Sequence, residues 1–257
     1  MTTIALRIDH RAWLDRPEVA TTISRALDHP AFQDLRRVAY NTGVRETRHQ
    51  PRTAASVKEI LLSKDCDSVI LDPGRKAGLN ASGAIFTGRH ILHWDADKRV
   101  ITSYVVVPYD AASPLAIAEG FSLLAAALDA FGGYLCVEPD YARARSAAGG
   151  NQPRRHEVRD YPRRARERKA HPRYAEWQET QIAGPEWGLF LGPGHLARVT
   201  PDPAVFPIIR DVGRGKLCLL SDNPEDALTE AFDARLEAAR RALAPVLMDV
   251  SEVPVDE

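Results

Sequence analysis

His195 is the residue best placed for chemistry, because it directly follows a Gly-Pro-Gly run at 192–194. The surrounding stretch, 185–199, predicts two short strands folded around that turn, with Trp187 at the entrance. An imidazole at a loop mouth could act as a general base or contact a partner. The alternative is that the turn itself requires glycines and His195 only begins the second strand.

A hydrolase would also need a nucleophile or a pair of carboxylates, and the sequence offers neither convincingly. No G-x-S-x-G or S-x-x-K motif occurs, and Ser82-Gly83 is not a nucleophile elbow. Asp72 and Asp110 could form a pair, but both adjoin turns, where aspartate is favoured anyway. The glycine-rich run 74–83 has its lysine in the wrong place for a phosphate-binding loop. We therefore predict no catalytic residue.

The histidines do not form a metal-ligand pattern either. His90 and His93 lie three residues apart, which on a strand places them on opposite faces. His93 with Asp95 falls short of a zinc site. His156 and His171 lie in an arginine-rich segment, where we expect them to be solvated. We expect no metal and no cofactor.

Charge is unevenly distributed along the chain. Residues 139–173 are rich in arginine and poor in large aliphatic residues, so this segment cannot build a core of its own. Its basic residues could contact nucleic-acid phosphates, and Tyr141, Tyr161 and Tyr174 could stack on bases. The acids scattered through it instead favour a solvated linker or an exposed helical insertion.

The sign of the charge reverses in the last part of the chain, from 221 to 257. This acidic helix and tail could complement the basic segment inside the fold. It could equally present an acidic face to a basic partner such as a nuclease. Both alternatives stay open from the sequence.

Composition sets the broader bounds. The chain has 257 residues, a net charge of −1 and 44% hydrophobic residues, enough for a substantial core. Cys66, Cys136 and Cys218 show no CxxC spacing, which favours a reducing compartment. The first residues do not read as a signal peptide, and no apolar run approaches the length of a membrane span. We expect a cytoplasmic protein with no membrane contact.

The elements that must position these residues follow from periodicity. The patterns predict an α+β fold with a mixed or mainly antiparallel sheet packed against helices, as one large domain or two similar α+β halves. The parts are an α+β N-terminal part (1–138), an arginine-rich linker or insertion (139–175) and an α+β C-terminal part (176–257). Strands are predicted at 3–8, 69–71, 84–94, 99–107, 134–138 and 216–220. Helices are predicted after Pro17, around 32–38, around 57–61, from Ser113 and from Asp222 to Leu243.

The sequence resembles bacterial immunity proteins of polymorphic-toxin and type VI secretion systems, of the Imm52-like or DUF3396-like families. The resemblance lies in the helix 118–131 that leads into Gly-Tyr-Leu-Cys-Val at 133–137, then the Trp187 stretch 186–196, and the closing strand 215–219 with its helix. It covers about the last 140 residues as a pattern rather than a diagnostic motif. The arginine-rich stretch 154–173 departs from the family pattern.

The resemblance implies a protein that is not an enzyme but binds and neutralises a cognate toxin, such as a nuclease, in the producing cell. Its partner-binding residues would be Trp187, His195, Glu230, Asp233 and Glu237. Two alternatives remain: a nucleic-acid-binding protein that uses the arginine-rich segment, and a hydrolase with a site near His195.

Overall fold

Strand β1 (Thr3–His10) lies in the middle of the structure and is hydrogen-bonded on both sides along nearly all of its length. Its neighbours β6 (Ile101–Pro108) and β7 (Gly132–Glu138) both run antiparallel to it. The computed structural model describes residues 2–11, 17–42, 49–74, 81–87, 100–109, 113, 115–149 and 174–248. The strand predicted at 3–8 is confirmed and continues for two residues, Asp9 and His10.

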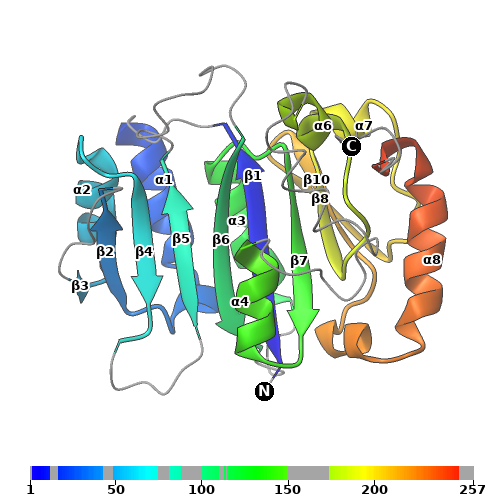
Figure 1. Ribbon diagram of the computed structural model, residues 1–257, viewed down its shortest axis with the longest axis horizontal. Coiled ribbons are helices and arrows are strands. Elements are labelled where there is room, and N and C mark those ends of the chain that lie inside the picture. The colour runs from blue at the N-terminus through cyan, green and yellow to red at the C-terminus, as the bar shows by residue number, and fades with distance from the viewer. Residues whose placement is uncertain are drawn as a thin grey trace, which may run out of the picture.

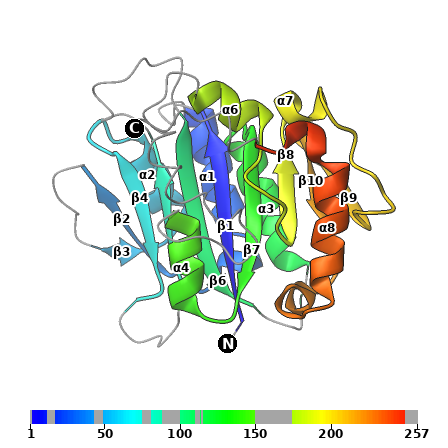
Figure 2. The ribbon, with the colours of Figure 1, turned by 45° about the vertical axis from the view of Figure 1, so that its right-hand side comes forward.

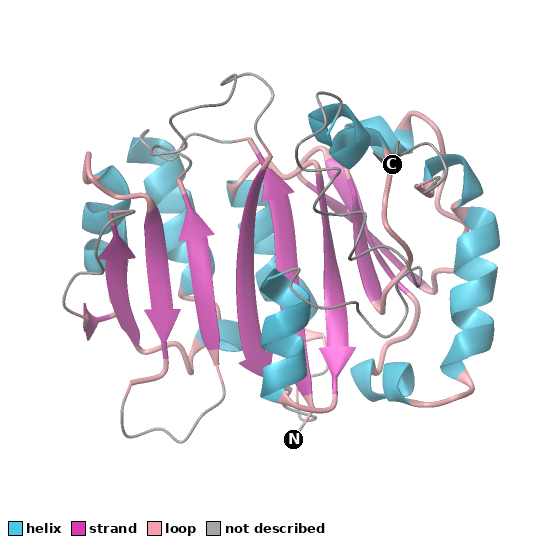
Figure 3. Cartoon of the chain, viewed as in Figure 1, coloured by secondary structure: helices cyan, strands magenta, loops and turns pink. Residues whose placement is uncertain are grey.

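The described strands form a single ten-stranded sheet in the order β3-β2-β4-β5-β6-β1-β7-β8-β10-β9 (Figures 1 and 3). Every neighbouring pair is antiparallel, which confirms the predicted α+β class with a mainly antiparallel sheet. The remaining strands are β2 (Arg37–Asn41), β3 (Gln50–Pro51), β4 (Ser68–Asp72), β5 (Ser82–Phe86), β8 (Gly188–Leu191), β9 (Ile208–Val212) and β10 (Gly215–Leu219).

Helices cover both faces of this sheet. In the view of Figure 1, α1 (Pro17–Leu27), α2 (Ala54–Leu62) and α3 (Ala116–Ala127) lie behind it. Helix α4 (Tyr141–Gly149) lies in front of β1, β6 and β7, and α8 (Phe232–Ala242) stands at the β10–β9 end (Figures 1 and 2). The core is therefore a layer of side chains on each side of one sheet.

The pairing of β7 with β8 joins the first part of the chain to the last part. Sequence alone left open whether the two parts share a sheet, and they do. Helix α4 falls inside the predicted linker 139–175, yet it buries Ala144 and Ala147 against the sheet. Residues 150–173, with most of the arginines, lie outside the described residues.

The predicted hairpin across 185–199 is wrong in its second half. After β8 the chain enters a one-turn helix, α7 (Pro193–Leu196), and β8 pairs with β7 and β10 instead of a returning strand. Pro193 occupies the first helical position, where its missing N–H costs nothing and its fixed φ suits a helix. The Gly-Pro-Gly run is thus a helix start.

Several other helices and strands begin or end at residues that differ from the prediction. The stretch expected to be helical around 32–38 is a short 3₁₀ turn, Pro30–Phe32, followed by β2. Helix α3 begins at Ala116, without a side-chain cap, instead of at Ser113. The helix expected from Asp222 is split into a 3₁₀ turn capped by Asn223 and then α8. The predicted pairing of the strands near 84 and 107 is confirmed as β5 with β6, although residues 88–99 between them lie outside the described part.

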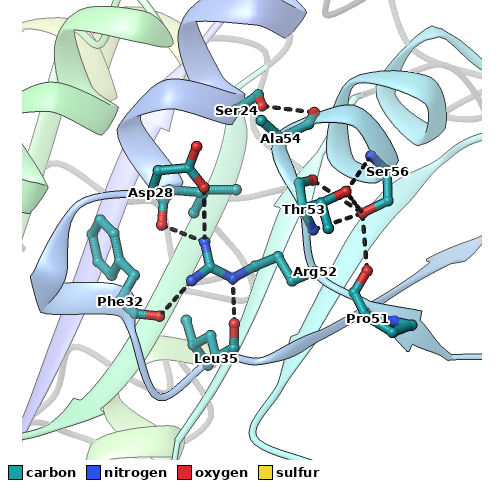
Figure 4. Close-up of polar contacts among 10 residues, drawn as sticks. Ser24, Asp28, Phe32, Leu35, Pro51, Arg52, Thr53, Ala54 and Ser56 are labelled. Carbon is teal, nitrogen blue, oxygen red and sulfur yellow. Dashed lines mark hydrogen bonds and ion pairs between the residues drawn. The ribbon is translucent and has the colours of Figure 1, made fainter.

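Arg52 ties the end of α1 to the start of β2 and α2 (Figure 4). Its guanidinium donates to the carbonyl oxygens of Leu27, Phe32 and Leu35, and it forms an ion pair with Asp28 at 3.7 Å. Carbonyls at a helix end have no partner within the helix, so a cation is favourable there. Burial lowers the pKa of Arg52, while the Asp28 carboxylate opposes that shift.

Replacing Gly133 by Ala should destabilise the fold much more than replacing its neighbour Gly132. A Cβ on Gly133 would lie 2.5 Å from the carbonyl oxygen of Arg7 and 3.2 Å from the Phe121 ring, so the strands must move. A Cβ on Gly132 would have no heavy atom closer than 3.6 Å. We expect urea unfolding to show a loss of about 1–3 kcal/mol for G133A and little change for G132A. Equal unfolding free energies for the two variants would contradict the strand geometry.

Candidate functional site

A small cavity lies where α6 (Tyr174–Thr180) and α7 meet the ends of β1, β7 and β8. The segment that follows α6 covers one side of it, and Figure 2 shows both helices at this end of the sheet. The cavity has room for a few waters or a very small group rather than a metabolite of ordinary size. Its lining comprises Arg7, Asp9, Gly132, Gly133, Tyr134, Gln178, Gln181, Ile182, Ala183, Gly184, Leu189 and His195.

A charged pair from β1 lies at the base of this cavity. Arg7 Nε donates to Asp9 Oδ1 at 3.2 Å, and Thr102 Oγ1 donates to the same oxygen at 2.6 Å. The Arg7 guanidinium also lies over the ring of Tyr134, 5.8 Å from its centroid. Two opposite charges can share this largely buried site because each one compensates the charge of the other.

α7 positions His195 against the other side of the cavity. The side chain is 1% exposed, and its Nδ1 accepts a hydrogen bond from the backbone N–H of Gly192 at 3.2 Å. Burial lowers the pKa of His195, and the backbone groups of Gln181 and Phe131 and the Asp9 carboxylate oppose this shift. Among the described residues, none forms a hydrogen bond of acceptable geometry with Nε2.

His10, next to Asp9 on β1, is buried on the opposite face of the sheet. Its Nε2 lies 2.8 Å from the hydroxyl of Ser103, which also accepts from the backbone N–H of Phe86 at 3.1 Å. Burial lowers the pKa of His10 to about 4, although Asp9 acts in the opposite direction. The ring is therefore neutral in the folded protein at neutral pH.

The five residues expected to bind a partner divide into two groups. Trp187 and His195 are each 1% exposed, and the indole Nε1 of Trp187 donates to the backbone oxygen of Ser221 at 3.1 Å. As placed here, neither side chain offers surface to a partner. Glu230, Asp233 and Glu237 are exposed, on α8 or just before it.

The sequence reasoning missed Arg7 and Asp9. They lie two residues apart on a strand that is otherwise largely apolar, so they share one face. Charged residues are rarely buried without a partner. Two opposite charges at positions i and i+2 of an otherwise apolar strand could therefore have indicated a buried ion pair.

The remaining chemical candidates are placed as follows. Asp72 lies against the ring of His49, and the other candidates lie outside the described residues: Asp110, His90, His93, His156 and His171. Within the described ranges no group of three or more His, Cys, Asp or Glu residues could hold a metal ion. No described helix combines the length and apolar character that crossing a membrane requires.

The cavity does bring His195 together with a carboxylate, Asp9, as a hydrolase near His195 would require. Because Nδ1 accepts from Gly192, the neutral ring carries its hydrogen on Nε2. A general base must present an unprotonated nitrogen to its substrate. This arrangement therefore suits hydrogen-bond donation better than proton abstraction.

Comparison with solved structures gives a similarity in fold. The structure resembles a solved T6SS protein of Pseudomonas aeruginosa, PA0821, with a TM-score of 0.59 and 15% sequence identity. The match covers 99% of this chain and 84% of that protein. No protein-family model matches the sequence. No curated protein matches it either. The similarity establishes a shared fold over the whole chain.

Replacing His10 by Gln should flatten the pH dependence of stability on the acid side. The unfolded chain has a His pKa near 6.5 and the folded protein about 4, so between these pH values only the unfolded state binds the proton. The free energy of unfolding should therefore fall as the pH drops through this window, by about 3 kcal/mol from this residue. The Gln amide can still reach the Ser103 hydroxyl.

Urea unfolding of wild type and H10Q from pH 7.5 to 4 measures this effect. The wild-type curve should fall more steeply toward acid pH than the H10Q curve, whose remaining slope is owed to other groups such as His195. Parallel curves over the whole range would show that His10 titrates normally.

Proposed function

We propose that this protein is an immunity protein that binds and neutralises a cognate bacterial toxin rather than an enzyme. The observation that carries the proposal is the similarity in fold, over 99% of the chain, to a protein described as a T6SS protein. The resemblance of the sequence to type VI and polymorphic-toxin immunity proteins points in the same direction. The proposed setting is the cytoplasm of the cell that produces the toxin.

The outer face of α8 is the surface best suited to such a partner. Between 221 and 242 the sequence has six acids and three arginines. Glu230, Asp233 and Glu237 follow each other at helical spacing and are exposed, whereas Phe232 and Leu236 are buried on the inner face. Arg240 forms an ion pair with Glu237, so part of this acidity is compensated within the helix.

A basic toxin surface would complement this face. Nuclease active sites are basic because they hold phosphates, and an acidic surface steers such a partner and speeds association. The buried positions of Trp187 and His195 exclude them from a contact made by the structure as it stands. The proposed surface is therefore Glu230, Asp233 and Glu237, supported from below by the apolar stripe of α8.

The nucleic-acid alternative rests on the arginine-rich segment, most of which lies outside the described residues. It therefore stays a prediction from the sequence. Salt-dependent DNA or RNA binding by the purified protein is the observation that would favour it over toxin binding.

Replacing Glu230, Asp233 and Glu237 together by Ala should weaken binding of the toxin, because the variant loses long-range attraction to a basic surface. The partner to test is the product of the adjacent reading frame, co-expressed and then titrated by calorimetry at low salt. We expect a rise in Kd of about tenfold or more, with a smaller salt dependence.

The matched control is E18A/E59A/D65A, which removes the same charge from exposed positions on and near α1 and α2. This control should bind like the wild type. If both triple variants bind equally well, α8 is not the contact surface. If the wild-type protein fails to protect cells from any neighbouring toxin, the immunity function itself is wrong.

A further inference from the structure

The cavity between His195 and Asp9 contains one hydrogen-bond donor and one acceptor that the described residues leave unpaired. The donor is Nε2–H of His195, in a side chain that is 1% exposed. The acceptor is Oδ2 of Asp9, in a residue that is 6% exposed. An unpaired buried donor is costly, so Nε2–H of His195 points to a ligand with an acceptor, and Asp9 in the same cavity offers that ligand an acceptor in turn.

The donor character of Nε2 is fixed by the backbone. Nδ1 of His195 accepts the N–H of Gly192, so the hydrogen of the neutral ring must be on Nε2. The start of α7 holds Gly192 in place, and its Cα approaches the backbone of Phe131 so closely that a Cβ would lie 2.1 Å from the Phe131 carbonyl oxygen. The ring therefore cannot change tautomer without losing its own anchor.

The acceptor is equally well defined. Arg7 Nε and Thr102 Oγ1 both donate to Oδ1 of Asp9, at 3.2 and 2.6 Å. Among the described residues both hydrogen bonds to the Asp9 carboxylate go to Oδ1, and none goes to Oδ2. Arg7 compensates the charge of Asp9, so the site has a free acceptor oxygen but little net charge.

Gly132 leaves the space between the two groups open. A Cβ at this position would lie 3.6 Å from Cε1 of His195 and 4.0 Å from Cβ of Asp9. One point is thus close to both side chains, and any residue other than glycine would occupy it. His195 and Asp9 therefore line the same small cavity beside a position that Gly132 leaves unfilled.

We propose that this cavity binds a primary carboxamide, whose carbonyl oxygen accepts from His195 Nε2 and whose NH₂ donates to Asp9 Oδ2. An anion would meet the Asp9 carboxylate, and an ammonium ion would meet the His195 N–H, so a neutral group with both functions fits best. The amide is either a free small molecule or the side chain of Asn or Gln from a protein. This site does not depend on the toxin-binding surface of α8.

Binding can be followed by the imidazole ¹⁵N and Cε1–H resonances of His195 in the full-length protein, titrated with acetamide. We expect a saturable shift with a Kd in the millimolar range, as for any ligand of so few atoms. Acetone lacks the donor and acetate lacks the NH₂ group, so neither should produce the saturable shift. The G132A variant should fold normally and lose the acetamide response, because its methyl group fills the gap.

Capped Gly-Asn-Gly and Gly-Ala-Gly peptides separate the two sources of the amide. A response to the Asn peptide alone supports a protein side chain, whereas a response to acetamide without the Asn peptide supports a small molecule. The proposal is overturned if acetamide gives no saturable shift in wild type, as when ordered water alone fills the cavity. It is also overturned if acetone acts like acetamide or if G132A responds like wild type.

Discussion

The close approach of β7 and β8 is the constraint on which the rest of the structure depends. A Cβ on Gly133 would lie 2.5 Å from a backbone oxygen of β1, and one on Gly188 would lie 2.8 Å from Leu135 and Leu219 side chains. A Cβ on Gly192 would collide with the backbone of Phe131. Glycine is required here by space, since none of the three has a positive φ. Strands β10 and β9 belong to the same sheet only through this pairing.

The buried Arg52 guanidinium and the buried Arg7–Asp9 pair differ in how fully their polar atoms are hydrogen-bonded. Arg52 donates to three carbonyl oxygens and pairs with Asp28, so its guanidinium is well compensated. In the Arg7–Asp9 pair on β1 the two charges compensate each other, but the hydrogen bonds to the carboxylate all go to Oδ1 among the described residues. A buried ion pair is weak evidence for stability, and complete pairing is the usual structural solution. The incomplete pair therefore distinguishes the cavity from the Arg52 cluster.

Much of the fold could be predicted in segments whose apolar residues recur regularly at strand or helix spacing. Alternation identified β1, and the stripe of Phe232, Leu236 and Ala239 identified α8. Strand β2 was missed because Phe32, Leu35 and Val38 happen to recur at helical spacing. Strand β9 was missed because Ile208 and Ile209 adjoin instead of alternating with polar residues. The contact of β7 with β8 joins segments far apart in sequence, and no local pattern encodes it.

The candidate site was less predictable because residue type is a poor guide to exposure. Trp187 and His195 were predicted to contact a partner because of their residue types, yet both are buried. The indole N–H of Trp187 donates to a backbone oxygen, and the imidazole of His195 accepts from a backbone N–H. Asp9 was overlooked although its charged partner Arg7 lies only two residues away, whereas its second partner, Thr102, lies on a neighbouring strand.

The two proposed sites would impose opposite physical demands on the fold. A surface that meets a charged partner must be solvated, so Glu230 and Asp233 stand outward on a helix whose other face is anchored by Phe232. A cavity that selects a neutral group needs fixed donors and acceptors, and the proposed cavity lies where α6 and α7 cover the strand ends. The β7–β8 pairing places β8, which leads into α7, and the strands before α8 in the same sheet as β1. Binding in the cavity can therefore leave the acidic surface unchanged, because no described cavity residue belongs to α8.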